Sequence, residues 1–342
     1  MSDKLYMKNI YVFLVLLLVV SQAWGQQRPQ YTQYMMNNYL LNPAITGIED
    51  YTDVKIGTRQ QWVGLEDAPV TYYITAHMPI NKEARQVRSV GPNKGLRSTH
   101  TVNQNRFVRA YPHHGVGVTA LTDKAGLLRR NHLNLTYAYH LPVSRTVTVS
   151  LGALGGIVKN GFNFAGATYG NPADPAYTKD YINRTYIDLG MGTWVYGQNF
   201  FVGLSGAQLL RANRDLNLSE EEDTEGVLQK HFFATGGYKI RLNQDVTLIP
   251  SVMVKFANPS PASIDVSLRG VFADRVWVGA TYRNKDALAA MAGVNINQIF
   301  DISYSYDYNT SNLGITNTGT HEIILGLKLF NKAGVICPKW MH

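Results

Sequence analysis

The feature that most constrains this chain is an alternation of apolar and polar residues that begins near residue 53 and continues almost to the end. Apolar residues occupy every second position in successive segments, a period typical of β-strands whose two faces meet different surroundings. In 300–308, Phe, Ile and Tyr fill one face and Asp and Ser fill the other. The pattern predicts an all-β protein.

Segments of this kind recur often enough to count. An even number of strands of roughly ten residues, with short turns on one side and longer loops on the other, is typical of bacterial outer-membrane barrels. Tight connections such as 197–198 and long ones such as 159–184 fall on opposite sides. A soluble sandwich would alternate too, but strand length and the tyrosines near strand ends favour a transmembrane barrel of about fourteen antiparallel strands. The fourteen segments are 53–63, 70–80, 114–123, 129–142, 145–158, 185–197, 199–209, 230–241, 244–256, 262–273, 275–284, 286–297, 299–309 and 320–330.

The first 25 residues have the parts of a secretory signal peptide: basic residues, an apolar run and the small-residue site Ala23–Gly25. The alternative is a membrane-anchoring helix, but the run Ile10–Val20 is about half of the roughly 20 residues that a spanning helix needs. We expect cleavage before Gln26. With Cys337 as the only cysteine, no internal disulfide is possible.

The remaining chain divides into three parts by composition. Residues 26–52 are polar and predict an N-terminal plug or periplasmic segment, residues 53–330 form the barrel, and residues 331–342 form a C-terminal periplasmic tail. The connection 81–113 is an insertion that parity places on the periplasmic side. Seven basic residues against Glu83 give it a net charge of +6: Lys82, Arg85, Arg88, Lys94, Arg97, Arg106 and Arg109.

That charge has two interpretations, a solvated loop or a docking site for a periplasmic component. We favour docking, with Arg85, Arg88, Lys94, Arg97, Arg106 and Arg109 as the candidate partner-binding residues. Nucleic acid is a less accessible partner for an exported protein than an acidic protein or the lipid of the outer membrane.

No motif of catalytic, cofactor-binding or metal-binding spacing is present, so we predict no enzyme activity, no cofactor and no metal. An outer-membrane hydrolase built on His140 or Ser150 is conceivable, but inward-facing polar residues of a barrel explain these two more simply.

Several short runs stand out along the chain: Gln30–Met35, Leu41–Gly47, Arg59–Gly64, Ala68–Thr71, Gly115–Val118, Asp123–Gly126 and His321–Gly326. Their motif residues include Arg59, Trp62, Asp123, Lys124 and Gly126. These runs resemble the PorP/SprF family of the type IX secretion and gliding-motility machinery of Bacteroidota, and the resemblance extends from about residue 28 to the last strand.

The resemblance implies a cell outer-membrane protein with a FadL-like barrel, in which Asn42, Pro43 and Ala44 match the Asn-Pro-Ala element of the plug. Proline fixes φ and asparagine bonds its local backbone, so a sharp turn is expected there, at the junction between the plug and the first strand. The implied partners are a secreted adhesin with a C-terminal sorting domain and the periplasmic machinery. The insertion 81–113 departs from the family pattern. The alternative function is a FadL-like channel for a hydrophobic or small solute.

If the first strand stays regular, Arg59 and Gln61 face the lumen and Trp62 faces outward.

Overall fold

The computed structural model describes residues 32–81, 112–163, 181–210, 229–257, 260–284, 286–310 and 317–331. All of them belong to one compact unit, Tyr31–His342. The predicted signal peptide, residues 82–111 of the basic insertion and the tail beyond residue 331 lie outside the described residues. Among the described residues, no helix is long and apolar enough to cross a membrane.

Two short 3₁₀ helices, η1 (Asn38–Leu40) and η2 (Pro43–Ile45), precede fifteen strand segments in the described part of the chain. The strands are β1 (Thr52–Gln60), β2 (Val70–Ile80), β3 (His113–Ala125), β4 (Leu128–Pro142), β5 (Val147–Asn163), β6 (Tyr181–Gly197), β7 (Phe200–Ala207), β8 (His231–Tyr238), β9 (Ile240–Arg241), β10 (Val246–Ala257), β11 (Ser260–Phe272), β12 (Val276–Arg283), β13 (Ala287–Asn295), β14 (Phe300–Asn309) and β15 (Thr320–Leu329).

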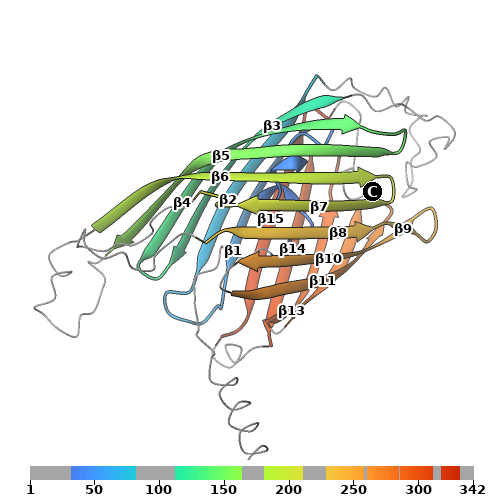
Figure 1. Ribbon diagram of the computed structural model, residues 1–342. Helices are drawn as coiled ribbons and strands as arrows, with labels where there is room; N and C mark the ends of the chain where they lie inside the picture. The colour runs from blue at the N-terminus through green and yellow to red at the C-terminus, as the bar shows by residue number, and fades with distance from the viewer. Residues whose placement is uncertain are drawn as a thin grey trace, which may run out of the picture. The chain divides into compact units, whose positions relative to one another are not determined.

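These strands close into one antiparallel barrel, which Figure 1 shows as a continuous wall. The first strand pairs with the last, β1 with β15, and the ring is completed where β10 pairs with β11. Both β8 and β9 pair with β10 and are separated only by Lys239, so they form one interrupted strand. The barrel therefore has fourteen strands, as the sequence predicted.

The predicted strand limits agree with the structure to within about five residues. The largest deviations are at β5, which extends to Asn163 and was expected to end at 158, and at β6, which begins at Tyr181 and was expected to begin at 185, so the expected connection 159–184 is shorter than predicted. The first strand also ends earlier than expected. The segment 53–63 was expected to remain extended, but β1 ends at Gln60. Trp62 has a φ of 50°, which turns the chain out of the strand. Regular alternation therefore does not extend to Gln61 and Trp62, so it predicts no placement for their side chains, whereas Arg59 does point inward and is 2% exposed.

Alternation along the strands separates an apolar outer face from a polar inner face. On β14, Asp301 and Ser305 are buried inside, while Tyr308 on the opposite face is 60% exposed. On β4, Leu135 is 67% exposed and its neighbour Asn134 is 3% exposed. An apolar outer surface is the arrangement required of a barrel surrounded by lipid.

Large aromatic side chains brace the inner face by lying over glycines of the neighbouring strand. Tyr73 pairs with Gly57, and a Cβ on Gly57 would come within 2.1 Å of the ring. Such packing fixes strand register and fills the space that a glycine leaves. The same arrangement occurs at Trp194 over Gly203, Phe201 over Gly237 and Trp277 over Gly293.

The barrel has two ends that differ in their connections. We call the end with the connections 143–146, 198–199 and 296–299 the short-turn end. The other end, which carries the connections 164–180, 208–230 and 310–319, is the loop end. The connection 81–112 leaves from the short-turn end.

Candidate functional site: the inner segment and its anchors

Residues 32–51, here called the inner segment, lie inside the barrel and are almost entirely buried. Their side chains and backbone contact inward-facing residues of strands on both sides of the ring. A buried non-helical backbone needs hydrogen-bond partners for its N–H and C=O groups, and here the barrel wall supplies many of them. The inner segment is therefore the main feature of the lumen in the described structure.

The Asn-Pro-Ala turn at η2 is the centre of this arrangement. The Asn42 side chain accepts a hydrogen bond from the Ala44 N–H at 2.9 Å, the local bond expected from the sequence. The amide nitrogen of Asn42 also donates to the carbonyl oxygens of Thr193 and Leu204, at 2.9 and 3.2 Å. One asparagine thus shapes the turn and attaches it to β6 and β7. The turn lies several residues before β1, so it is not at the junction with the first strand, where it was expected.

Glycines on the inner wall allow this turn to approach the strands closely. A Cβ on Gly152 of β5 would lie 2.4 Å from the backbone nitrogen of Ala44, and one on Gly115 of β3 would lie 1.9 Å from the carbonyl oxygen of Thr46. Backbone atoms occupy the space that a side chain would fill. Only glycine permits contact this close, so the inner wall is shaped to receive the turn.

Hydroxyl and imidazole groups of the wall hold the backbone of the turn. Ser150 donates to the carbonyl oxygen of Ala44 at 2.6 Å, and Ser205 donates to that of Leu41 at 2.7 Å. His140 Nε2 lies 2.8 Å from the carbonyl oxygen of Thr46. Ser150 and His140, the residues considered for a hydrolase, both contact the inner segment.

Histidines also hold the end of the inner segment nearest the short turns. The Gly47 N–H donates to His77 Nδ1 at 3.2 Å, and His113 Nε2 lies 3.2 Å from the Gly47 carbonyl oxygen. His113 and His140 stack with ring centroids 4.4 Å apart. Burial raises the pKa of the nearby Tyr39 phenol, whose hydroxyl is 2.6 Å from Thr136 Oγ1.

The opposite end of the inner segment is held by a buried ionic cluster. Arg59 bridges Asp307 at 2.9 Å and Glu322 at 3.0 Å, which joins β1, β14 and β15 across the seam of the barrel. The Thr32 N–H donates to Glu322 at 2.9 Å, and the Thr32 hydroxyl accepts from Arg59 at 2.6 Å. The side chain of Gln33 donates to the Glu322 carbonyl oxygen at 2.9 Å.

These two anchors lie at different heights in the lumen. Arg59 lies near the loop end of β1. His77 of β2 is the cross-strand partner of Asp53, which lies near the short-turn end of β1. Six residues of strand separate Asp53 from Arg59, or about 20 Å at roughly 3.3 Å per residue. The inner segment therefore crosses a large part of the lumen. Charged side chains hold it at one height, and histidines hold it at the other, where glycines allow it to approach the wall.

The ionic cluster continues along the inner wall. Arg283 lies 3.8 Å from Asp307 and 3.4 Å from Asp265, which in turn pairs with Lys255 at 2.9 Å. A second group, in which Lys55 pairs with Asp53 at 2.8 Å, lies nearer the short-turn end. No group of His, Cys, Asp and Glu within the described ranges is arranged to hold a metal ion.

The other motif residues lie at the loop end. Asp123 points inward and accepts from the Thr71 hydroxyl at 2.7 Å, and Lys124 points outward and is exposed. Gly126, with a φ of 57°, forms the tight turn between β3 and β4 and donates its N–H to the Asp67 carbonyl oxygen. The Trp62 N–H donates to the Thr320 hydroxyl at 3.2 Å. Only Arg59 of this motif contacts the inner segment through a hydrogen bond that the described structure shows.

Sequence reasoning missed several residues that hold the inner segment. Glu322 falls within the run His321–Gly326, but nothing in that run marks it as an anchor, and no motif includes His77 or Ser205. The available signal was a charged or polar residue at an inward position of a strand, which period-two alternation identifies. The basic residues of the insertion, Arg85 to Arg109, lie outside the described residues.

The family model described as "Type IX secretion system membrane protein PorP/SprF" matches residues 23–327. No curated protein matches the sequence. Among solved structures, the chain is similar to the Acinetobacter baumannii outer membrane protein Omp33, with 12% identity, a TM-score of 0.44, and coverage of 83% of this chain and 99% of that one. It is also similar to a Pseudomonas aeruginosa FadL homologue, with 9% identity, a TM-score of 0.44, and coverage of 89% and 94%.

Proposed function

The chain belongs to the PorP/SprF family of type IX secretion system membrane proteins, and from this premise we propose that it helps to export or anchor a large secreted adhesin with a C-terminal sorting domain. The family makes it a component of the secretion machinery in the outer membrane, with partners in that machinery. In the proposal, the barrel contributes a fixed position between a surface partner and a periplasmic partner, and it performs no chemistry.

The observation that carries the proposal is the way the lumen is occupied. The inner segment is bonded to the wall at two heights, and Arg59, Asp307 and Glu322 beside it are each at most 2% exposed. Such bonding at two heights favours a fixed inner segment, as expected of a barrel that holds other proteins in position. The polar groups considered for catalysis, His140 and Ser150, are bound to backbone carbonyl oxygens of the inner segment, which supports a structural use for them.

The basic insertion 81–113 supplies the proposed contact with a periplasmic component. Its two ends, at Ile80 and His113, both lie at the short-turn end, which in barrels of this kind faces the periplasm. Its charge of +6 suits an acidic protein surface. The opposite, loop end would then present the docking surface for the adhesin.

The alternative, a FadL-like uptake channel, requires a route for solute past the inner segment. Opening that route would break the contacts of Asn42, Ser150 and Arg59, each of which contributes of order 1 kcal/mol or more. The tethering proposal requires no such movement. Assays of solute uptake and of adhesin display therefore distinguish the two proposed functions.

Cross-linking in cells, followed by purification of the full-length protein, tests the proposal. We expect a sorting-domain protein and a periplasmic component of the machinery to purify with the barrel. The variant R85E/R88E/R97E should lose the periplasmic component, whereas R145E/R241E/R275E, with the same charge change at exposed arginines of the short-turn end, should retain it. Recovery of the barrel alone, or loss of the component in both variants, would contradict the docking role.

A further inference from the structure

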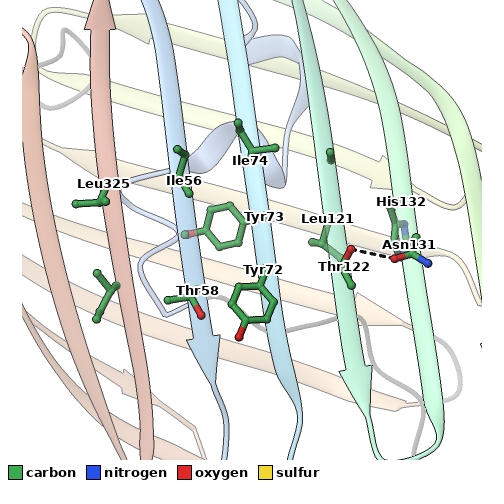
Figure 2. Close-up of a pocket in the computed structure, with 13 residues that line it drawn as sticks. Ile56, Thr58, Tyr72, Tyr73, Ile74, Leu121, Thr122, Asn131, His132 and Leu325 are labelled. Carbon is green, nitrogen blue, oxygen red and sulfur yellow. Dashed lines mark hydrogen bonds between the residues drawn. The ribbon is translucent and has the colours of Figure 1, made fainter.

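The outer wall of the barrel contains a hollow that spans β15 and β1 to β4. The outside of a closed barrel is ordinarily convex, yet this region contains an open hollow of about 650 Å³. Figure 2 shows Ile56, Tyr72, Ile74 and Leu325 around it. The small outward side chains Thr58, Ala120 and Thr122 leave the space between these larger neighbours.

Strand register shows that the outward residues around the hollow form successive rows, which change from apolar to polar to basic toward the loop end. The row nearest the middle of the wall is apolar throughout: Ile56, Ile74, Ala120, Leu133 and Ile157. Two residues closer to the loop end, the next row is polar or amphipathic: Thr58, Tyr72, Thr122, Asn131 and Lys159. The Thr122 hydroxyl donates to Asn131 Oδ1 at 2.9 Å, the bond drawn in Figure 2.

The third row, at the edge of the loop end, brings two cations together. Lys124 and Arg129 are direct cross-strand partners, and both point outward and are exposed. Lys159, on the adjacent strand β5, is also outward and exposed. Like charges placed directly opposite each other destabilise a sheet unless an anion lies between them.

No ion pair joins these three cations to any described residue. Asp123, next in sequence to Lys124, points inward and binds Thr71 instead. Asp67 is in the connection between β1 and β2, where its backbone contacts Gly126. Lys124 and Arg129 therefore form an electropositive rim, with Lys159 beside it in the polar row, and the apolar row of the hollow lies below. This order of groups matches the phosphate, linker and acyl chain of a lipid.

We propose that this surface binds one molecule of lipid A, with its phosphate between Lys124, Arg129 and Lys159 and an acyl chain in the hollow. The hollow lies on the lipid-facing side of an outer-membrane barrel, so acyl chains are the local solvent. The rim is at the loop end, which in bacterial barrels faces the outside, where the outer leaflet supplies this phosphorylated glycolipid. The Thr122–Asn131 pair lies at the height of the amide and hydroxyl groups through which lipid A joins its phosphorylated sugar to its acyl chains.

The test measures the lipids that remain bound to full-length protein purified from outer membranes in mild detergent, by native mass spectrometry. We expect about one lipid A per barrel. Each interfacial cation contributes about fivefold in affinity, so the variant K124Q/R129Q/K159Q should lower lipid A binding by roughly a hundredfold. The control R145Q/R241Q/R275Q removes the same charge from the short-turn end and should keep the lipid.

A second variant, Ala120→Trp, fills the hollow and leaves the cations intact, so it should displace the acyl chain and lower lipid A binding as well. Heat-modifiable gel mobility verifies that each variant is folded, and if the triple variant is not, Lys124→Gln and Arg129→Gln are measured separately. The proposal is overturned if the wild-type protein carries no lipid A or only phospholipid. It is also overturned if folded cation variants retain as much lipid A as the control.

Discussion

Replacement of Gly152 by alanine tests the fit between the barrel wall and the Asn-Pro-Ala turn. The added methyl group would lie 2.4 Å from the backbone nitrogen of Ala44, far inside the separation of about 3.5 Å at which non-bonded atoms pack. To relieve the overlap, the turn or β5 must move by about 1 Å. That movement lengthens the bond from Ser150 to the Ala44 carbonyl oxygen, now 2.6 Å.

Gly155→Ala on the same strand is the matched control. Its methyl group would meet Leu189 Cδ2 at 3.7 Å, an ordinary contact. Both variants change glycine to alanine in β5, which contributes about 0.4–1 kcal/mol through the unfolded chain in either case. The difference between them therefore isolates the overlap with the turn, for which overpacking predicts a loss of about 1–3 kcal/mol for Gly152→Ala.

The assay is equilibrium unfolding in guanidinium chloride, followed by tryptophan fluorescence, with both variants in the same lipid vesicles. The reasoning predicts a lower unfolding midpoint for Gly152→Ala with an unchanged denaturant dependence. Equal midpoints for the two variants would refute the close fit between Gly152 and the turn.

Three further changes test the anchors and the outer face. Asn42→Ala removes the bonds to Ala44 and to two strands and should cost about 1–3 kcal/mol, measured as a shift in the same unfolding midpoint. Arg59→Met removes the cation that bridges Glu322 and Asp307 and leaves Arg283, at 3.8 Å, beside Asp307, so it should cost about 3–5 kcal/mol; neutralising both carboxylates in that background should restore part of the loss. Leu135→Arg should destabilise by about 2–4 kcal/mol because lipid surrounds this leucine, whereas Leu242→Arg in a short turn should cost about 0–1 kcal/mol; equal effects would argue against the assigned membrane face.

The barrel could be predicted from the sequence because alternation is a local property that survives in each strand. The Tyr and Ser residues of 299–309 fall on opposite faces as expected, and the even number of strands followed from counting. The predicted end of β1 was wrong because the turn imposes a positive φ at Trp62. The alternation of apolar and polar side chains does not indicate this backbone angle.

The site was harder to predict because its contacts join residues far apart in the chain. The residue types of the Asn-Pro-Ala turn predict its local hydrogen bond, but nothing near Asn42 in the sequence indicates Thr193 or Leu204 as partners. Glu322 and Arg59 meet only because β1 and β15 close the barrel. Register supplies these pairings, and alternation alone does not fix register between strands distant in sequence.

The proposed role of this barrel in displaying a surface adhesin is tested most directly by the cell-surface proteome of a deletion strain. We expect a sorting-domain protein to disappear from the surface and to return with the wild-type gene, while uptake of fatty acids and other small solutes is unchanged. Intact display of every sorting-domain protein, together with loss of solute uptake, would rule out this role and support a channel.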